Sequence, residues 1–203
     1  MSGGPVAGRA GRLMLTARLS TARRAVELLD RKQRALAVDC ARLELVAARA
    51  AEDFERAART ATRWLRRSVA LDGRRILLDS MPEATVEVVV GYAVTMGVRH
   101  PASCGVRFGP EPPLAGSSAL VQALRAHRTA LAAALQLAAA QRAVALVSEE
   151  LARTRQQQRT LELRWIPRLE QQLAVLVQRL DETEREENVR LRWAARRTPW
   201  ERS

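Results

Sequence analysis

The stretch LTARLSTARRAVELLDRKQRALAVDCARL, residues 15–43, decides the fold. Its apolar and small residues recur with alternating gaps of four and three, and this a/d pattern continues to Leu71 over about eight heptads. No proline or glycine interrupts residues 12–72, so we expect one helix of roughly 85–90 Å at 1.5 Å per residue. Asp72 and Gly73 are expected to end it.

A second heptad arm occupies the C-terminal part of the chain. Ser117 or Ser118 is the expected N-cap, and gaps of three and four run from Leu137. Past Leu161 the seam steps by fours, a stutter that loosens a left-handed supercoil, and Pro167 removes one helical hydrogen bond there. We therefore expect this helix to kink or loosen near Pro167. The seam residues predicted on the two arms are Leu15, Leu19, Val26, Leu29, Leu36, Leu161, Trp165, Leu169, Leu173, Leu176 and Leu180.

The segment between the arms has a different composition. Residues 84–98 are rich in β-branched side chains and predict either two strands joined near Gly91 or one strand with a bulge. Residues 99–116 contain several prolines and glycines and are predicted to be loop. The expected fold class is mainly α, a long antiparallel two-helix coiled-coil hairpin with a small head containing a β-hairpin between the arms. The expected domains are an N-terminal arm (1–72), a connecting head with the β-hairpin at about 85–98 (73–117), and a C-terminal arm (118–203).

Composition limits the possible functions. Aromatic residues make up 3% of the 203 residues, too few for the core of a typical sandwich or doubly wound sheet. Thirty-four basic and 22 acidic residues give a net charge of +12, which favours partners with anionic surfaces. We find no signal-peptide core and no apolar run near the ~20 residues that span a bilayer, so a cytoplasmic protein is expected. Cys40 and Cys104 are expected to be free thiols.

No catalytic, cofactor-binding or metal-binding set emerges from the sequence. The only lysine, Lys32, lies inside the first helical pattern and not after a glycine-rich phosphate-binding loop. The two histidines are far apart and join no cysteine cluster. The acidic residues between 181 and 187 have Arg179, Arg185 and Arg190 as helical neighbours, which indicates a solvated helix face rather than a carboxylate or metal site. Trp64 and Trp165 occupy seam positions and are interpreted as packing residues.

Three separated segments resemble one family, the D subunit of V-type (archaeal and bacterial A/V-type) ATPases. Residues 22–36, ARRAVELLDRKQRAL, resemble a segment of its N-terminal arm. Residues 86–88 (VEV) and 96–101 (MGVRHP) resemble its β-hairpin. The most specific likeness is residues 166–170 (IPRLE), followed by LDE and ERE within residues 180–187. The sequence departs from the family pattern at Ala25, usually glycine, and at Arg159, usually asparagine.

The resemblance implies a non-catalytic rotor shaft, the central stalk of a proton- or sodium-translocating ATPase or ATP synthase. Such a shaft transmits torque between the catalytic A/B hexamer and the membrane ring. The implied partners are the catalytic A and B subunits, the F subunit and the ring-linking C/d subunit, with no nucleic acid and only indirect membrane contact. The implied location is the cytoplasm, peripheral to the cell membrane as part of the complex. No cofactor or metal is implied.

Two surfaces receive roles through the resemblance. The first is a tip that would face the hexamer, made of Arg9, Arg12, Leu13, Arg190, Leu191 and Arg192. The second is a head surface that would contact the base of the stalk, made of Val86, Val88, Met96, Gly97 and Val98. The alternative from a different class is a basic coiled-coil protein that binds nucleic acid or acts as a scaffold. An enzyme with an unrecognised site is a third reading.

Overall fold

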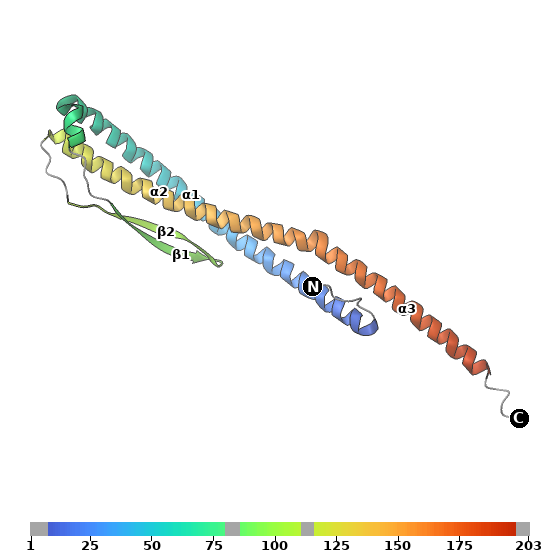
Figure 1. The fold of residues 1–203 in the computed structure, drawn as a ribbon. Coiled ribbons are helices and arrows are strands. Elements are labelled where there is room, and N and C mark those ends of the chain that lie inside the picture. Colours follow the sequence, from blue (N-terminus) through green and yellow to red (C-terminus); the bar gives the residue numbers. More distant parts are fainter. Residues whose placement is uncertain (1–7, 80–85, 111–115, 198–203) are drawn as a thin grey trace. The chain divides into compact units, whose positions relative to one another are not determined.

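The computed structural model describes residues 8–79, 86–110 and 116–197 (Figure 1). The elements follow in the order α1 (Gly8–Asp79), β1 (Glu87–Thr95), β2 (Val98–Arg107), α2 (Ser118–Thr160), a π-helical turn η1 (Leu161–Trp165) and α3 (Ile166–Arg197). The expected class is confirmed, because the chain is mainly helical and an antiparallel β-hairpin separates the two helical arms. The fold divides into two compact units, residues 1–31 with 154–203 and residues 32–153, which are treated separately below.

In the first unit, the start of α1 pairs antiparallel with α3. Arg9 binds Glu184 at 3.0 Å and Arg23 binds Glu170 at 2.8 Å. Residue numbers therefore decrease along α3 as they increase along α1, which defines an antiparallel pair. An apolar cluster lies between and next to these ion pairs. Its buried members are Leu15, Leu19, Ala22, Leu169 and Leu176, with Ile166, Leu173 and Leu180 packed against them. The exposed ion pairs contribute little, so this cluster supplies most of the pairing energy.

In the second unit, the rest of α1 pairs antiparallel with α2. Leu36 and Val147 are completely buried, with Cys40 and Leu151 beside them. Each fully buried aliphatic side chain contributes on the order of 1.5–3 kcal/mol. Lys32 Nζ donates to Glu150 Oε1 at 2.5 Å next to this cluster. Small residues also lie in the seam, since Ala61, Ser68 and Ala143 are buried, and they permit close approach of a neighbouring element.

The β-hairpin is longer than the sequence predicted. Of the two readings, a join near Gly91 is wrong, because β1 runs through Gly91 to Thr95 and the turn lies at Met96 and Gly97. The reading with a bulge is closer, since Gly91 pairs with Ser103 but Tyr92 pairs with Pro101, which leaves Ala102 as an extra residue in β2. Residues 84 and 85 lie outside the described residues.

The predicted loop at residues 99–116 is wrong for residues 99–107, which belong to β2. Proline is excluded from central strands because it cannot donate to the ladder, but both strands of a two-stranded sheet are edges. Pro101 is therefore tolerated beside the bulge. Residues 111–115 of the predicted loop lie outside the described residues.

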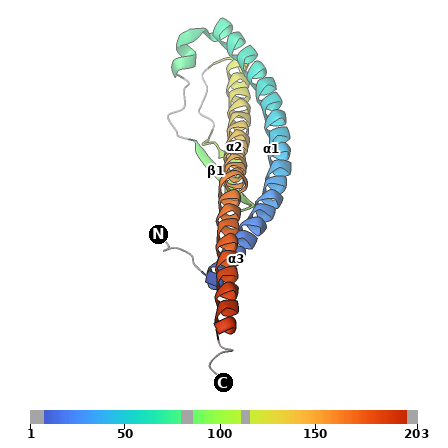
Figure 2. The same ribbon diagram turned by 90° about the vertical axis from the view of Figure 1, so that its right-hand side faces the viewer.

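The hairpin lies against α2 in the second unit, as Figures 1 and 2 both show. Arg128 donates to the Gly109 carbonyl oxygen at 3.1 Å, and Gln136 donates to the Cys104 carbonyl oxygen. Nearer the turn, Val98 packs on the cluster around Leu36 and Val147. The expected head is thus a ribbon folded back along the helix pair of this unit.

The ends of α1 and α2 follow local sequence signals. Gly73 has φ 75° and ψ 165°, a conformation that favours glycine, and it interrupts α1 at the predicted stop. The residues from 74 to Asp79 are again helical, although the sequence pattern predicts that the helix stops at Asp72 and Gly73. The Ser117 carbonyl oxygen accepts from the Leu120 N–H at 3.0 Å, so Ser117 is the N-cap of α2.

The irregularity predicted near Pro167 takes the form of the π-helical turn η1. The Ile166 N–H donates to the Leu161 carbonyl oxygen, a bond that spans five residues instead of four. Pro167 has no N–H for the Leu163 carbonyl, and its ring would clash with that carbonyl in a regular α-helix. The wider turn relieves this clash, and the extra residue changes the helical phase where the seam steps by fours.

One stretch of the C-terminal arm corrects the expectation about apolar runs. Among the described residues, the continuous helix Ser118–Arg196 contains an 18-residue window with mean hydropathy 1.6. By length and composition alone this window could cross a membrane. A single helix of this kind is weak evidence for a span.

Candidate interaction surfaces

The two sides of the predicted tip both lie in the first unit. Arg9, Arg12 and Leu13 lie at the start of α1, where Arg9 contacts Glu184. Helix α3 continues thirteen residues beyond Glu184 to Arg197, about 20 Å of helix, while α1 begins one residue before Arg9. Figure 1 shows this end of α3 extending past the start of α1. The predicted residues Arg190, Leu191 and Arg192 lie on that extension.

Large apolar side chains are exposed on this part of the molecule. Leu13 is 73%, Leu191 67% and Trp193 68% exposed, and Val189 is also exposed. Val189, Leu191 and Trp193 lie within five residues of one helix, and exposed apolar residues gathered in this way mark interaction sites. Sequence reasoning placed Leu13 and Leu191 here through the resemblance but assigned no role to Val189 or Trp193. The sequence signal that could have found them is their position beside Leu191 in the same segment.

The acidic residues of α3 are exposed and face solvent. Among the described ion pairs, Glu184 binds Arg9, and Glu186 lies 3.8 Å from Arg190 on the same helix. Both pairs have highly exposed side chains. This arrangement suits a solvated helix face that keeps a charged tip soluble.

The predicted seam residues differ in how deeply they are buried. Leu15, Leu19, Leu36, Leu169 and Leu176 are buried, and Val26, Leu29, Leu161, Leu173 and Leu180 are half-buried. Trp165 departs from the expected packing position, because its side chain is 51% exposed. The π-helical turn that ends at Trp165 supplies the reason, since it shifts the helical phase there.

The predicted head surface splits into two parts. Val86, Val88 and Met96 are exposed, whereas Val98 packs inward on the cluster around Leu36. Gly97 shares the turn with Met96. Val94 and Tyr92 extend the exposed face. The Arg99 guanidinium lies over the Tyr92 ring, with its central carbon 4.3 Å from the ring centroid. The hairpin therefore presents an apolar face with a basic group beside it.

The two histidines noted in the sequence have internal partners, and both cysteines are buried. His100 is buried, its Nδ1 donates to the Pro101 carbonyl oxygen at 3.0 Å, and its Nε2 lies 3.0 Å from Thr95 Oγ1. His127 Nδ1 donates to the Ala123 carbonyl oxygen at 2.9 Å. Cys40 and Cys104 are not disulfide-bonded, as expected, and both are buried; Cys40 Sγ lies 3.6 Å from Glu44 Oε1. Within the described ranges, no group of three or more His, Cys, Asp or Glu side chains could hold a metal ion.

Comparisons with known proteins agree with this arrangement of elements. A family model for the D subunit of ATP synthase matches residues 12–196. The chain is also similar to the D subunit of the A-type ATP synthase of Methanopyrus kandleri, with 42% identity over 76 residues. That alignment covers 37% of this chain and spans 33% of the relative's length. The family match covers both helical arms and the hairpin between them.

Proposed function

The chain belongs to the D-subunit family of ATP synthases, and we propose that it is the non-catalytic shaft of the central stalk in a proton- or sodium-translocating A/V-type ATP synthase. The family match over residues 12–196 is the observation that carries this proposal. The end of α3 supports it, because Leu191 and Trp193 are exposed on a helix that continues past the start of α1.

The role of a shaft agrees with how the helices are held in each unit. Torque must pass along the helices without separating them, which requires a continuous apolar seam rather than exposed ion pairs. Each unit has such a seam, around Leu19 and Leu169 in the first and around Leu36 and Val147 in the second. Neither seam requires a catalytic side chain, and the chain would contribute to ATP turnover only by acting on its partners.

The proposed partners follow the two surfaces described above. The tip, Arg9, Arg12, Leu13 and residues 190–192, would enter the hexamer of catalytic A and B subunits. The exposed hairpin face at Val86, Val88 and Met96 would contact the base of the stalk, where a ring-linking subunit connects it to the membrane ring. The F subunit would bind the shaft directly. The complex would hold the chain at the cytoplasmic side of the cell membrane, with no direct contact to lipid.

Reconstitution tests this function. The chain is mixed with the A, B and F subunits of the same organism, and size-exclusion chromatography is combined with an ATPase assay. We expect one copy per A/B hexamer and a change in ATP turnover when the chain is present. Failure to associate at low salt would refute the shaft role.

The same preparations test the alternative function. A nucleic-acid-binding protein of net charge +12 would bind duplex DNA with an affinity that falls steeply as salt rises. Such binding, together with failure to join the hexamer, would favour the alternative. The family match does not favour it.

A further inference from the structure

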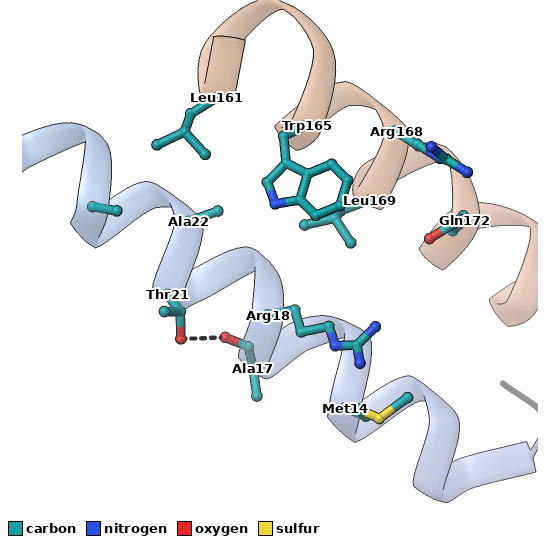
Figure 3. A pocket seen from close by; sticks show the side chains of 11 residues that line it. Met14, Ala17, Arg18, Thr21, Ala22, Leu161, Trp165, Arg168, Leu169 and Gln172 are labelled. Carbon is teal, nitrogen blue, oxygen red and sulfur yellow. Dashed lines mark hydrogen bonds between the residues drawn. The ribbon is translucent and has the colours of Figure 1, made fainter. Parts of the chain in front are cut away.

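An open groove of about 890 Å³ lies between α1 and the η1–α3 segment in the first unit (Figure 3). One wall is formed by Met14, Arg18, Thr21 and Ala25 of α1. The other wall is formed by Leu161, Trp165, Arg168 and Gln172. The groove runs beside the apolar cluster around Leu19 and shares Leu169 with it.

The two walls have the same spacing. Each consists of residues i, i+4, i+7 and i+11, which is the spacing of one stripe along a helix. Eleven residues correspond to about 16 Å of helix, or three turns. The small side chains of Ala17 and Ala22 also line the groove. The two antiparallel helices expose rows of residues with the same spacing, and small residues lie between these rows. This arrangement forms a groove that can accommodate a third helix.

Trp165 provides a large apolar contact surface in this groove. Its indole projects from η1 toward α1, as Figure 3 shows, and it is 51% exposed. Met14 on the opposite wall is 39% exposed. Tryptophan is enriched among the residues that dominate binding energy at interfaces. The π-helical turn therefore moves a seam residue to a position where a partner can cover it.

The charges at the groove define the partner. Arg18 and Arg168 stand on opposite walls, and both are exposed. Within the part of the chain that the structure describes, neither forms an ion pair, whereas their neighbour Arg23 binds Glu170. Two guanidinium groups on opposite walls, with an indole between the helices, favour carboxylates on the partner and disfavour cationic side chains.

We propose that this groove binds an amphipathic α-helix of another polypeptide, with its apolar face against Trp165 and carboxylates toward Arg18 and Arg168. The site is distinct from the tip and from the hairpin face. It does not depend on the shaft function, so the two proposals can fail independently.

The test uses the full chain with Trp64, Trp193 and Trp200 replaced by Phe, so that fluorescence reports on Trp165. The probe is a synthetic 18-residue amphipathic helix with Leu and Ala on one face and Glu along both edges of that face. A matched peptide carries Lys at the Glu positions. We expect the Glu peptide to shift Trp165 emission to shorter wavelength in a saturable manner. We expect the Lys peptide to bind at least about tenfold more weakly.

Variants separate groove binding from general attraction to a basic protein. The double variant Arg18→Glu, Arg168→Glu should lower the affinity for the Glu peptide about tenfold and raise the affinity for the Lys peptide. Arg24→Glu, an exposed α1 position that does not line the groove, should change neither by more than about twofold. Thr21→Phe should lower the affinity for both peptides, because the larger side chain fills the groove without changing its charge. Circular dichroism checks that each variant keeps its helix content.

Several results would overturn the proposal. Equal binding of the Glu and Lys peptides would exclude recognition of carboxylates, and the absence of any saturable shift would exclude a helix-binding groove. A Trp165 shift that grows with protein concentration without peptide would show that a second copy covers the groove. A duplex DNA oligonucleotide that shifts Trp165 emission and loses this effect in the double Arg variant would identify nucleic acid as the occupant.

Discussion

The Asp72 carboxylate binds Ser117 twice, 45 residues away in the sequence. Asp72 Oδ1 accepts from the Ser117 N–H at 2.9 Å, and Oδ2 accepts from the Ser117 hydroxyl at 2.6 Å. Because Ser117 is the N-cap of α2, this pair fastens the last residue of α1 before the Gly73 break to the first turn of α2. A carboxylate at a helix N-terminus is also favoured by the helix dipole.

Replacing this carboxylate should weaken the second unit. Asp72→Ala removes both acceptors and leaves the half-buried Ser117 N–H and hydroxyl without them, at a cost of about 1–3 kcal/mol in free energy of unfolding. Asp72→Asn should cost about half as much, because one amide oxygen can still accept. Urea unfolding measures the difference. The exposed Asp79→Ala is the matched control, and an equal loss in both variants would contradict a specific role for this pair.

The hairpin turn contains a strained residue whose replacement should stabilise it. Met96 has φ 48° and Gly97 has φ 86°, as a type I′ turn requires, and methionine is unfavourable in this left-handed conformation. Met96→Asn should slow amide hydrogen exchange in β1 and β2 by a factor that corresponds to about 1 kcal/mol. Met96 is 47% exposed, so little buried area is lost. Gly97→Ala should change exchange in the opposite direction, and identical exchange in both variants would refute the turn assignment.

Burial at the centre of the second unit predicts a large packing effect. Leu36 is completely buried, so Leu36→Ala should lower the free energy of unfolding by about 2–5 kcal/mol. Leu45 lies nine residues later on α1 and is 64% exposed. Leu45→Ala should therefore change the free energy of unfolding by less than about 0.5 kcal/mol. Denaturant unfolding followed by circular dichroism measures both. Comparable losses would mean that Leu45 is covered in solution.

Charge reversal at the tip should impair assembly without unfolding the chain. The tested variant combines Arg12→Glu, Arg190→Glu and Arg192→Glu, and the control reverses three exposed arginines of the second unit, Arg49, Arg63 and Arg142. The tip variant should bind an A/B hexamer about tenfold more weakly at low salt, because reversed charges at an interface repel. Helix content should not change in either variant, since all six side chains are exposed. Equal effects of the two variants on hexamer binding would remove the tip from the interface.

Helix periodicity, the break at Gly73 and the N-cap at Ser117 are local properties, and for this reason the sequence predicts them well. A gap of three or four places residues on one helix face in any tertiary setting. The length of β2 is not local in this sense. Pro101 and Gly105 argue for a loop. Only pairing with β1, the hydrogen bond from Gln136 to the Cys104 carbonyl oxygen and packing of Val98 against the helices make a strand favourable there.

The candidate groove shows the same division. Pro167 and the steps of four predict an irregular helix near residue 165, because proline lacks an N–H. They do not determine whether the helix kinks or widens into a π-helical turn, since both relieve the clash. The choice of the wider turn exposes Trp165 and leaves it facing Arg18 of α1 across the groove.

The sequence alone determined that two long heptad arms flank a β segment, because the spacing of apolar residues sets which helix faces must be buried. It also carried the family resemblance, through short motifs that keep their order along the chain. The tertiary structure decided where the hairpin lies, which seam residues are buried and which side chains form the groove. These depend on packing between residues distant in sequence, such as Val98 on Leu36 and Asp72 on Ser117, and no local pattern records those contacts.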